Sequence, residues 1–400
     1  MPDHEHGQSA VSGQPRHSKA LAASTSQHKI PAERGPPATA TEVSGQALEW
    51  SGKQPHGLTV GEDQIALVIA STGDTRTAVG DEVEGSRALG AGPSTIEIAF
   101  VNNMPSSAFD ATEQQFTGLL ESAAELAGAT VRVSRYALAG LERTEKVEER
   151  LARDYSAVEH IYAERLDGLI VTGTEPLAKD LRQEAYWSEL AELIEWAQRA
   201  TASAVLSCLA AHAAALLFDG IERETLETKC SGVFVQEVRT DHPLTADLGP
   251  TVHMPHSRLN DLPSLLLQEG GYKSLIESPE MNWTVAVKDR GCCSFVLVQG
   301  HPEYSTTSLL REYRRDLQRY LRAERAVAPT IPVGYLDDVG QRLLEDFEAR
   351  AVAGPSDPEA MNDFPFEPVA ERLVNTWQSS GTRLYANWLR LIEHRRQSGA

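Results

Sequence analysis

The chain has 400 residues, 41% of them hydrophobic, which allows one large domain with extensions or two to three domains. Its 57 acidic and 37 basic residues give a formal net charge of −20. Such an acidic chain is poorly suited to nonspecific binding of nucleic acid or of an anionic membrane surface, although it can still hold a local basic pocket.

The cysteines point to a reducing environment. Cys208, Cys230, Cys292 and Cys293 form no CxxC pair and no spacing typical of metal ligands. We therefore expect free thiols and no metal site. The sequence has no run of 18 apolar residues, and its beginning lacks the apolar segment of a secretory signal. These features predict a cytoplasmic protein with neither a membrane nor a nucleic acid as partner.

The first part of the chain differs in composition from the rest. Residues 1–60 are rich in Ser, Gly, Pro, His and Ala and have no apolar periodicity, so we expect a disordered tail with solvated histidines. Residues 61–94 form a lead-in segment with one candidate strand at 65–70, followed by a stretch rich in Gly and Thr.

From residue 95 onward, short apolar runs alternate with segments of helical spacing. We expect strands at 96–101, 131–138, 169–171 and from 204, and helices at 112–127, 140–164, 187–200 and up to 217. This alternation predicts an α/β fold with a doubly wound, mostly parallel sheet. Sites in such sheets lie at the C-terminal ends of the strands, where Asn103, Gly173 and Cys208 stand.

Beyond Lys229 the pattern changes. We expect strands at 232–238, 283–287 and 293–299, with loops that hold residues 255–258 and Pro279. A long helix at about 307–325 follows, then an acidic helix near 337–351 between Pro-rich loops, and a basic helix at 377–395.

Cys208 stands where a buried strand turns sharply into an Ala-rich helix. The free N–H groups of a helix N-terminus favour a thiolate and stabilise an oxyanion, so Cys208 is a candidate nucleophile. A lone cysteine in such a run is also compatible with a small buried apolar residue. His301 follows another apolar strand and is the candidate base, and Glu303, two residues later, can hold its imidazole. Taken alone, this segment also fits an ordinary surface turn.

Several separated blocks of the sequence resemble known families. The strand, Cys208 and helix, with the later His-Pro-Glu, are similar to class I glutamine amidotransferases. The closer resemblance is to the homoserine O-succinyltransferase (homoserine O-acyltransferase) family of methionine biosynthesis. The blocks that carry it include Asn103-Met104-Pro105, Asp167 to Gly173, Cys208, Lys229 to Val233, Pro255 to Arg258, Gly300 to Tyr304, Glu312, Arg315, Trp377, Gly381 and Asn387-Trp388.

The resemblance runs from about residue 95 to residue 395. It implies an amidotransferase-like acyltransferase domain with a C-terminal helical extension, in which residues 326–375 form an insertion longer than the family's connection. Its implied site residues fall into three groups. The catalytic residues are Cys208, His301 and Glu303; the substrate-binding residues are Lys229, Ser257, Arg258, Glu312 and Arg315; the backbone oxyanion donors are Leu209 and Asn103.

Two local departures from the family pattern stand out. Ser106-Ser107 replace the lysines that usually follow Asn-x-Met-Pro, next to the oxyanion side of the site. At the position where the family has Glu with acetyl-CoA and Gly with succinyl-CoA, a gapless alignment places Leu177, which is neither.

The resemblance implies a ping-pong homoserine O-acyltransferase that uses Cys208 as an acyl carrier. Its co-substrates are acyl-CoA, with succinyl favoured over acetyl, and L-homoserine; no bound cofactor and no metal are expected. A serine O-acyltransferase, a glutamine amidotransferase of the same fold and a non-catalytic binding protein are the alternatives. Ser207-Cys208-Leu209 lacks the glycines usual around an amidotransferase cysteine. The oligomeric state is left open, with a homodimer as one option.

Overall fold

The computed structural model describes residues 67–69, 95–239, 241–353 and 358–398. The tail expected at 1–60 and most of the lead-in segment lie outside these residues. The helices of the described part are α1 (Phe109–Ala127), α2 (Glu145–Asp154), α3 (Trp187–Ala200), α4 (Leu209–Asp219), α5 (Ser264–Glu269), α6 (Ser308–Leu321), α7 (Asp338–Ala353), α8 (Phe366–Ala370) and α9 (Gln378–Ser398). None of these described helices is long and apolar enough to cross a membrane.

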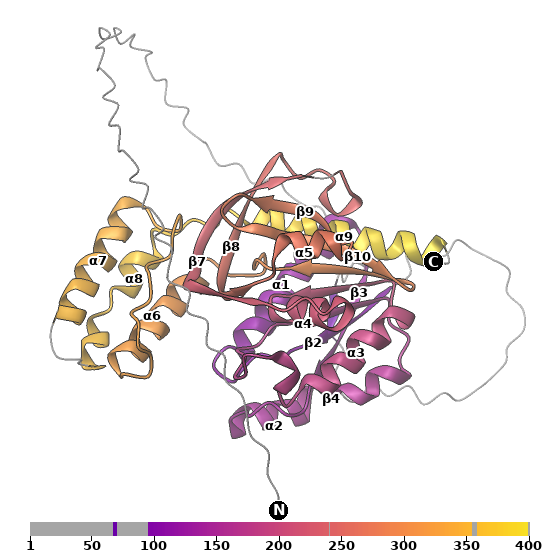
Figure 1. Ribbon diagram of the computed structural model, residues 1–400, viewed down its shortest axis with the longest axis horizontal. Coiled ribbons are helices and arrows are strands. Elements are labelled where there is room, and N and C mark those ends of the chain that lie inside the picture. The colour runs from indigo at the N-terminus through magenta and orange to yellow at the C-terminus, as the bar shows by residue number, and fades with distance from the viewer. Residues whose placement is uncertain (1–66, 70–94, 240, 354–357, 399–400) are drawn as a thin grey trace, which may run out of the picture. The chain divides into compact units, whose positions relative to one another are not determined.

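The strands of the described residues form one mixed sheet (Figure 1). They are β1 (Leu67–Ile69), β2 (Ile96–Val101), β3 (Val131–Ala137), β4 (Ser156–Ala157), β5 (Gly168–Val171), β6 (Ser203–Ser207), β7 (Glu224–Val238), β8 (Thr251–Asp261), β9 (Lys273–Ser278), β10 (Asn282–Arg290) and β11 (Cys293–Val298). The order is β1-β3-β2-β5-β6-β11-β10-β9-β7-β8, with β4 paired to β3.

β11 is the strand at which the sheet changes direction. Strands β1 to β6 are parallel to their neighbours, and β11 is parallel to β6. From β11 to β8 the pairs are antiparallel. The predicted α/β class and mostly parallel sheet are therefore confirmed, with an antiparallel half appended on one side.

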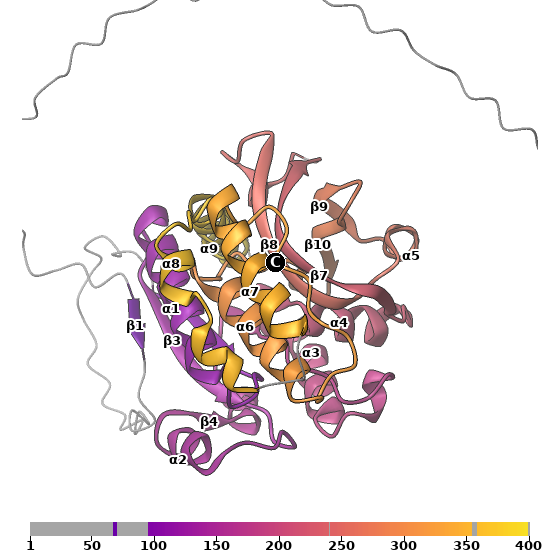
Figure 2. The same cartoon turned by 90° about the vertical axis from the view of Figure 1, so that its left-hand side faces the viewer.

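Helices cover both faces of the parallel half, which explains its strands of continuous apolar residues. Alternate residues of a strand enter different cores. In β6, Leu206 packs in the cluster with α3 and α4, while Val205 packs in the cluster with α1 and α9. A third cluster joins α6, α7 and α8, which lie together at the left of Figure 1 and towards the viewer in Figure 2.

The expected helix at 140–164 is shorter than predicted. Helix α2 ends at Asp154, and Tyr155 is extended, with φ −124° and ψ 150°. The Tyr155 ring is buried against Phe109, and its hydroxyl donates to Glu113 at 2.6 Å. These contacts with α1 hold Tyr155 in its extended conformation and so end the helix. β4 and a 3-10 helix (Val158–Ala163) follow.

The prediction of a loop at residues 255–258 was wrong, because these residues lie inside β8. Proline usually interrupts a strand, but it is tolerated at a sheet edge, where its missing N–H removes no ladder bond. β8 is the edge strand, and Pro255 pairs only with Val233 of β7. Its carbonyl accepts the N–H of His301 at 2.8 Å, so this edge lies against the loop that follows β11.

Candidate active site

Cys208 occupies a strained turn between β6 and α4. Its backbone has φ 49° and ψ −108°, a conformation that is costly for a residue with a side chain and is typical of functional sites. The Cys208 N–H donates to the carbonyl of Val298 at 2.7 Å, which ties the turn to the end of β11. The sharp turn presents the thiol at the N-terminus of α4, where nucleophiles of α/β enzymes stand.

His301 is brought to this turn because β11 is parallel to β6 and ends level with it. Val298 pairs with Ser207, so both chains leave the sheet at the same edge. His301 is only 9% exposed, and its Nδ1 lies 2.8 Å from Oε1 of Glu303. Cys208 lies close enough to His301 to favour its protonated form and to raise its pKa. The structure thus brings the three predicted catalytic residues together.

The surroundings of His301 favour its protonated form. Burial by itself lowers the pKa of His301, but the Glu303 carboxylate and the contact with Cys208 outweigh it and raise the pKa to about 10. At neutral pH the imidazole therefore holds a proton between a carboxylate and the thiol. This arrangement suits a group that donates a proton first and accepts one later.

The raised pKa of His301 predicts a pH dependence of stability. Because the folded pKa, about 10, exceeds the ordinary value of 6.5, the stabilisation is fully present below about pH 6.5 and is lost as pH rises through about 10. We expect the free energy of unfolding of the wild type, relative to that of His301→Asn, to fall across this range. Urea unfolding of both proteins at several pH values measures it, and a constant difference would contradict the charge assignment.

The two expected oxyanion donors differ in the structure. Leu209 is the first residue of α4, where the helix leaves backbone N–H groups free of intrahelical partners. The Asn103 N–H instead donates to Oγ1 of Thr172 at 2.8 Å, so it is already engaged. Gly173 lies against the turn, because a Cβ at this glycine would be 3.3 Å from Leu209 N. The Asn103 N–H is therefore not free in this structure, whereas Gly173 is a direct neighbour of the Leu209 N–H.

Four predicted substrate-binding residues meet on one side of the site. Lys229 Nζ donates to Glu312 Oε2 at 3.2 Å and to Asp316 Oδ2 at 2.8 Å. The hydroxyl of Ser257 also donates to Glu312. Burial raises the pKa of Glu312, but these partners outweigh burial, so the pKa lies below its usual value. Arg315 is 40% exposed and pairs with Asp316 at 2.9 Å. We call Lys229, Ser257, Glu312, Arg315 and Asp316 the acceptor cluster, after the acyl acceptor that the resemblance implies for Glu312 and Arg315.

Tyr304 connects the acceptor cluster to the predicted catalytic residues. Its ring stacks on His301 with centroids 4.3 Å apart and an interplanar angle of 18°. Its hydroxyl donates to Oε1 of Glu312 at 2.6 Å. Sequence reasoning missed Tyr304 and Asp316 as site residues, although Tyr304 directly follows Glu303 and Asp316 lies one turn beyond Glu312 on α6.

Arg258 lies apart from the acceptor cluster. Successive residues of a strand point to opposite faces, so Ser257 reaches Glu312 while Arg258 points the other way. Arg258 bonds with Asp261 at 2.9 Å and with His256 at 2.9 Å, both buried. Arg258 therefore lies outside the acceptor cluster, and its expected role in substrate binding stays a prediction.

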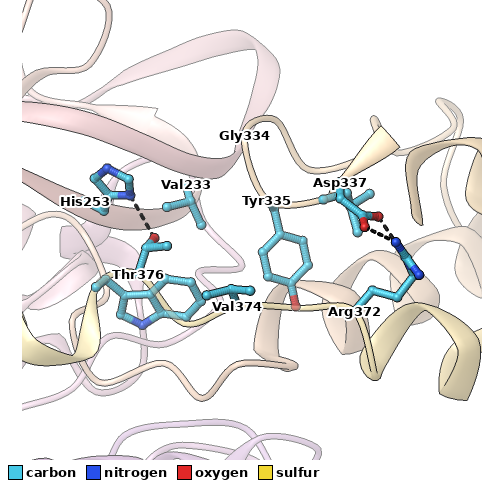
Figure 3. Close-up of a pocket in the computed structure, with 10 residues that line it drawn as sticks. Val233, His253, Gly334, Tyr335, Asp337, Arg372, Val374 and Thr376 are labelled. Carbon is cyan, nitrogen blue, oxygen red and sulfur yellow. Dashed lines mark hydrogen bonds and ion pairs between the residues drawn. The ribbon is translucent and has the colours of Figure 1, made fainter. Parts of the chain in front are cut away.

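A separate pocket lies between β7, β8 and the chain around residues 333–337 and 372–377 (Figure 3). His253 bonds to Thr376 at 2.8 Å, and Arg372 pairs with Asp337. None of the predicted catalytic residues lines this pocket. Its lining residue Trp377 donates to the carbonyl of Tyr304 at 2.9 Å, so this wall supports the loop that carries His301.

Comparisons of the sequence with known proteins all point to the same family. A family model described as homoserine O-succinyltransferase matches residues 81–397. The chain is 41% identical over 294 residues to a homoserine O-succinyltransferase of Rhodopseudomonas palustris, covering 74% of this chain and 87% of that protein. It is 39% identical over 302 residues to the enzyme of the same name from Methylorubrum extorquens, covering 75% and 88%.

Similarity to solved structures is weaker. A glutamine amidotransferase of Methylobacillus flagellatus matches with a TM-score of 0.40 and 14% identity, over 75% of this chain and 96% of that chain. The fold class follows from the sheet described above.

Proposed function

The chain belongs to the homoserine O-succinyltransferase family, a family of acyltransferases, and on this premise we propose that it transfers an acyl group from acyl-CoA to the hydroxyl of L-homoserine. We propose succinyl as the preferred acyl group and Cys208 as its carrier. The observation that supports this most is the strained turn of Cys208 beside the His301–Glu303 pair, whose Nδ1 and Oε1 atoms lie 2.8 Å apart.

In the first half-reaction, the Cys208 thiolate attacks the thioester carbonyl and a C–S bond forms. The tetrahedral intermediate collapses with loss of the CoA thiolate, which takes the proton of His301. Once Cys208 is acylated, it no longer supports the proton on His301. The imidazole then becomes a base suited to the second half-reaction.

The Leu209 N–H and the space beside Gly173 suit the oxyanion of both half-reactions. A methyl group in Gly173→Ala would stand 3.3 Å from Leu209 N and 3.4 Å from Cys208 Cβ. We expect the rate of Cys208 acylation to fall by about 10²-fold, the usual cost of a damaged oxyanion site. Stopped-flow release of CoA measures the acylation rate, with Gly118→Ala as the control because nothing lies within 4 Å of a Cβ there. An acylation rate close to that of the wild type would contradict this oxyanion assignment.

In the second half-reaction, His301 takes the proton of the homoserine hydroxyl, and the oxygen attacks the Cys208 thioester. The new ester bond forms as the Cys208 thiolate leaves. Glu312 binds the ammonium of homoserine in this proposal, since it is a partly exposed carboxylate whose position is fixed by three donors. Arg315 is placed to bind its carboxylate through two parallel hydrogen bonds.

Arg315 can turn to a substrate without leaving Asp316 unpaired. Asp316 also binds Lys229 at 2.8 Å and Arg325 at 3.0 Å. We expect Arg315→Lys to raise the KM for homoserine by about 10-fold, because lysine cannot form the two-pronged contact. Acylation of Cys208 by acyl-CoA should stay near the wild-type rate, because it precedes homoserine binding.

Arg319→Lys is the matched control for this prediction. Arg319 lies one turn further along α6, is also 40% exposed, and pairs with Glu175 outside the acceptor cluster. The two variants should differ in the KM for homoserine and agree in thermal stability. An equal KM in both would remove Arg315 from the binding site, and a preference for serine over homoserine would reassign the acceptor.

Mass spectrometry of the intact protein tests the proposed function and its donor together. Incubation with succinyl-CoA, without homoserine, should add one succinyl group to Cys208, and acetyl-CoA should add its acyl group more slowly. Peptide mapping places the adduct. A protein that forms no adduct with either donor would contradict the thioester mechanism.

A further inference from the structure

Glu303 uses only one of its carboxylate oxygens in the interaction with His301. Oε1 accepts from Nδ1 of His301, while Oε2 is buried and has no hydrogen-bond partner among the described residues. The Glu303 side chain is 4% exposed, so solvent reaches it poorly. A buried carboxylate oxygen without a donor is costly, and native proteins nearly always supply one.

Tyr385 of helix α9 carries a second buried polar atom without a partner. The residue is 2% exposed, and no described group bonds to its hydroxyl. Its ring is held between Phe116 and Trp388, with centroids 6.5 Å and 6.0 Å away. The phenol therefore cannot swing out to solvent without breaking the core between α1 and α9.

Helix α9 presents Tyr385 to the chain that carries Glu303. Gly381 lies one helical turn before Tyr385, on the same face. A Cβ at Gly381 would be 2.9 Å from the carbonyl oxygen of Pro302, so the helix and the residue before Glu303 are in direct contact. Burial, followed by the charge of Glu303, raises the pKa of Tyr385 well above its usual value, which keeps the phenol protonated and able to donate.

We propose that Tyr385 is a positioning residue of the catalytic site. Its hydroxyl donates a hydrogen bond to one water molecule, which in turn donates to Oε2 of Glu303, and this bridge holds the carboxylate in line with Nδ1 of His301. One bridging water satisfies both unpaired atoms, and helix α9 becomes part of the active site. This inference rests on the proposed role of Glu303 in the acyl transfer.

Tyr385→Phe tests the proposal by removing one oxygen and keeping the ring. We expect kcat/KM to fall by about 10-fold, the size expected for loss of one hydrogen bond to a charged group. The low-field proton resonance of His301 Nδ1–H, which reports its hydrogen bond to Glu303, should also shift. Tyr272→Phe is the matched control, because this buried hydroxyl donates to the carboxylate of Asp219 at 2.8 Å, outside the proposed site.

A double-mutant cycle separates positioning from a general effect on the fold. In the Glu303→Ala background, Tyr385→Phe should change kcat/KM by no more than about 2-fold, since the group it positions is gone. Equal losses in both backgrounds, or no loss in the single variant, would overturn the proposal. Glu303→Ala alone distinguishes the two levels: if it keeps the wild-type rate, the proposed catalytic role of Glu303 itself is wrong.

Discussion

Cys208→Ser is expected to abolish acyl transfer, with kcat lowered by about 10⁴-fold or more. A serine hydroxyl is nearly the same size as the thiol, but at neutral pH it is a far weaker nucleophile than a thiolate. The strained backbone at φ 49° should be retained, since the change adds no atom to the turn. Steady-state kinetics and the loss of the acyl adduct in intact-mass spectra measure the effect.

Cys292→Ser is the control for this variant. Cys292 is also partly exposed but lies before β11, where its thiol donates to the carbonyl of Gln198 at 3.2 Å. We expect wild-type kinetics from it. Substantial turnover in Cys208→Ser would mean that the acyl group passes from CoA to the acceptor without a cysteine intermediate.

His301→Asn is expected to give the second largest loss, because it removes the acid and base of both half-reactions and keeps a polar side chain. Glu303→Gln should cost less, since an amide oxygen can still accept from Nδ1 but cannot stabilise imidazolium. Single-turnover measurements of CoA release and of ester formation follow the two half-reactions separately. Both should slow in His301→Asn.

His253→Asn is the matched histidine control. His253 bonds to Thr376 on the wall of the separate pocket and contacts none of the proposed catalytic residues in the described structure. It should keep the wild-type rate. An active His301→Asn variant, or a Glu303→Gln variant more damaged than His301→Asn, would exclude the proposed triad.

The residues of the acceptor cluster could be predicted only in part from the sequence. Glu312, Arg315 and Lys229 were expected near the substrate from the family resemblance, and Lys229 does bond to Glu312 at 3.2 Å. Ser257 and Arg258 were expected together, yet they point to opposite faces of β8. That separation depends on residues 255–258 being a strand, which the proline at the start of this segment argues against.

The sequence by itself determined the local parts of this protein. Apolar runs and their spacing predicted β2, β5, β6 and β11, and the turn at Cys208 follows from an apolar strand running into an Ala-rich helix. The spacing of His301 and Glu303 places both side chains on one side of an extended chain. These features depend on neighbours within a few residues, where propensity and periodicity act directly.

The tertiary structure decided which distant groups meet. It brought the edge of β8 to the loop after β11, occupied the Asn103 N–H with Thr172, and placed Tyr304 between His301 and Glu312. It also laid α9 against Pro302, some 80 residues earlier in the chain. Such contacts depend on strand order, register and helix packing, and no local pattern in the sequence encodes them, because each is the joint result of many long-range contacts.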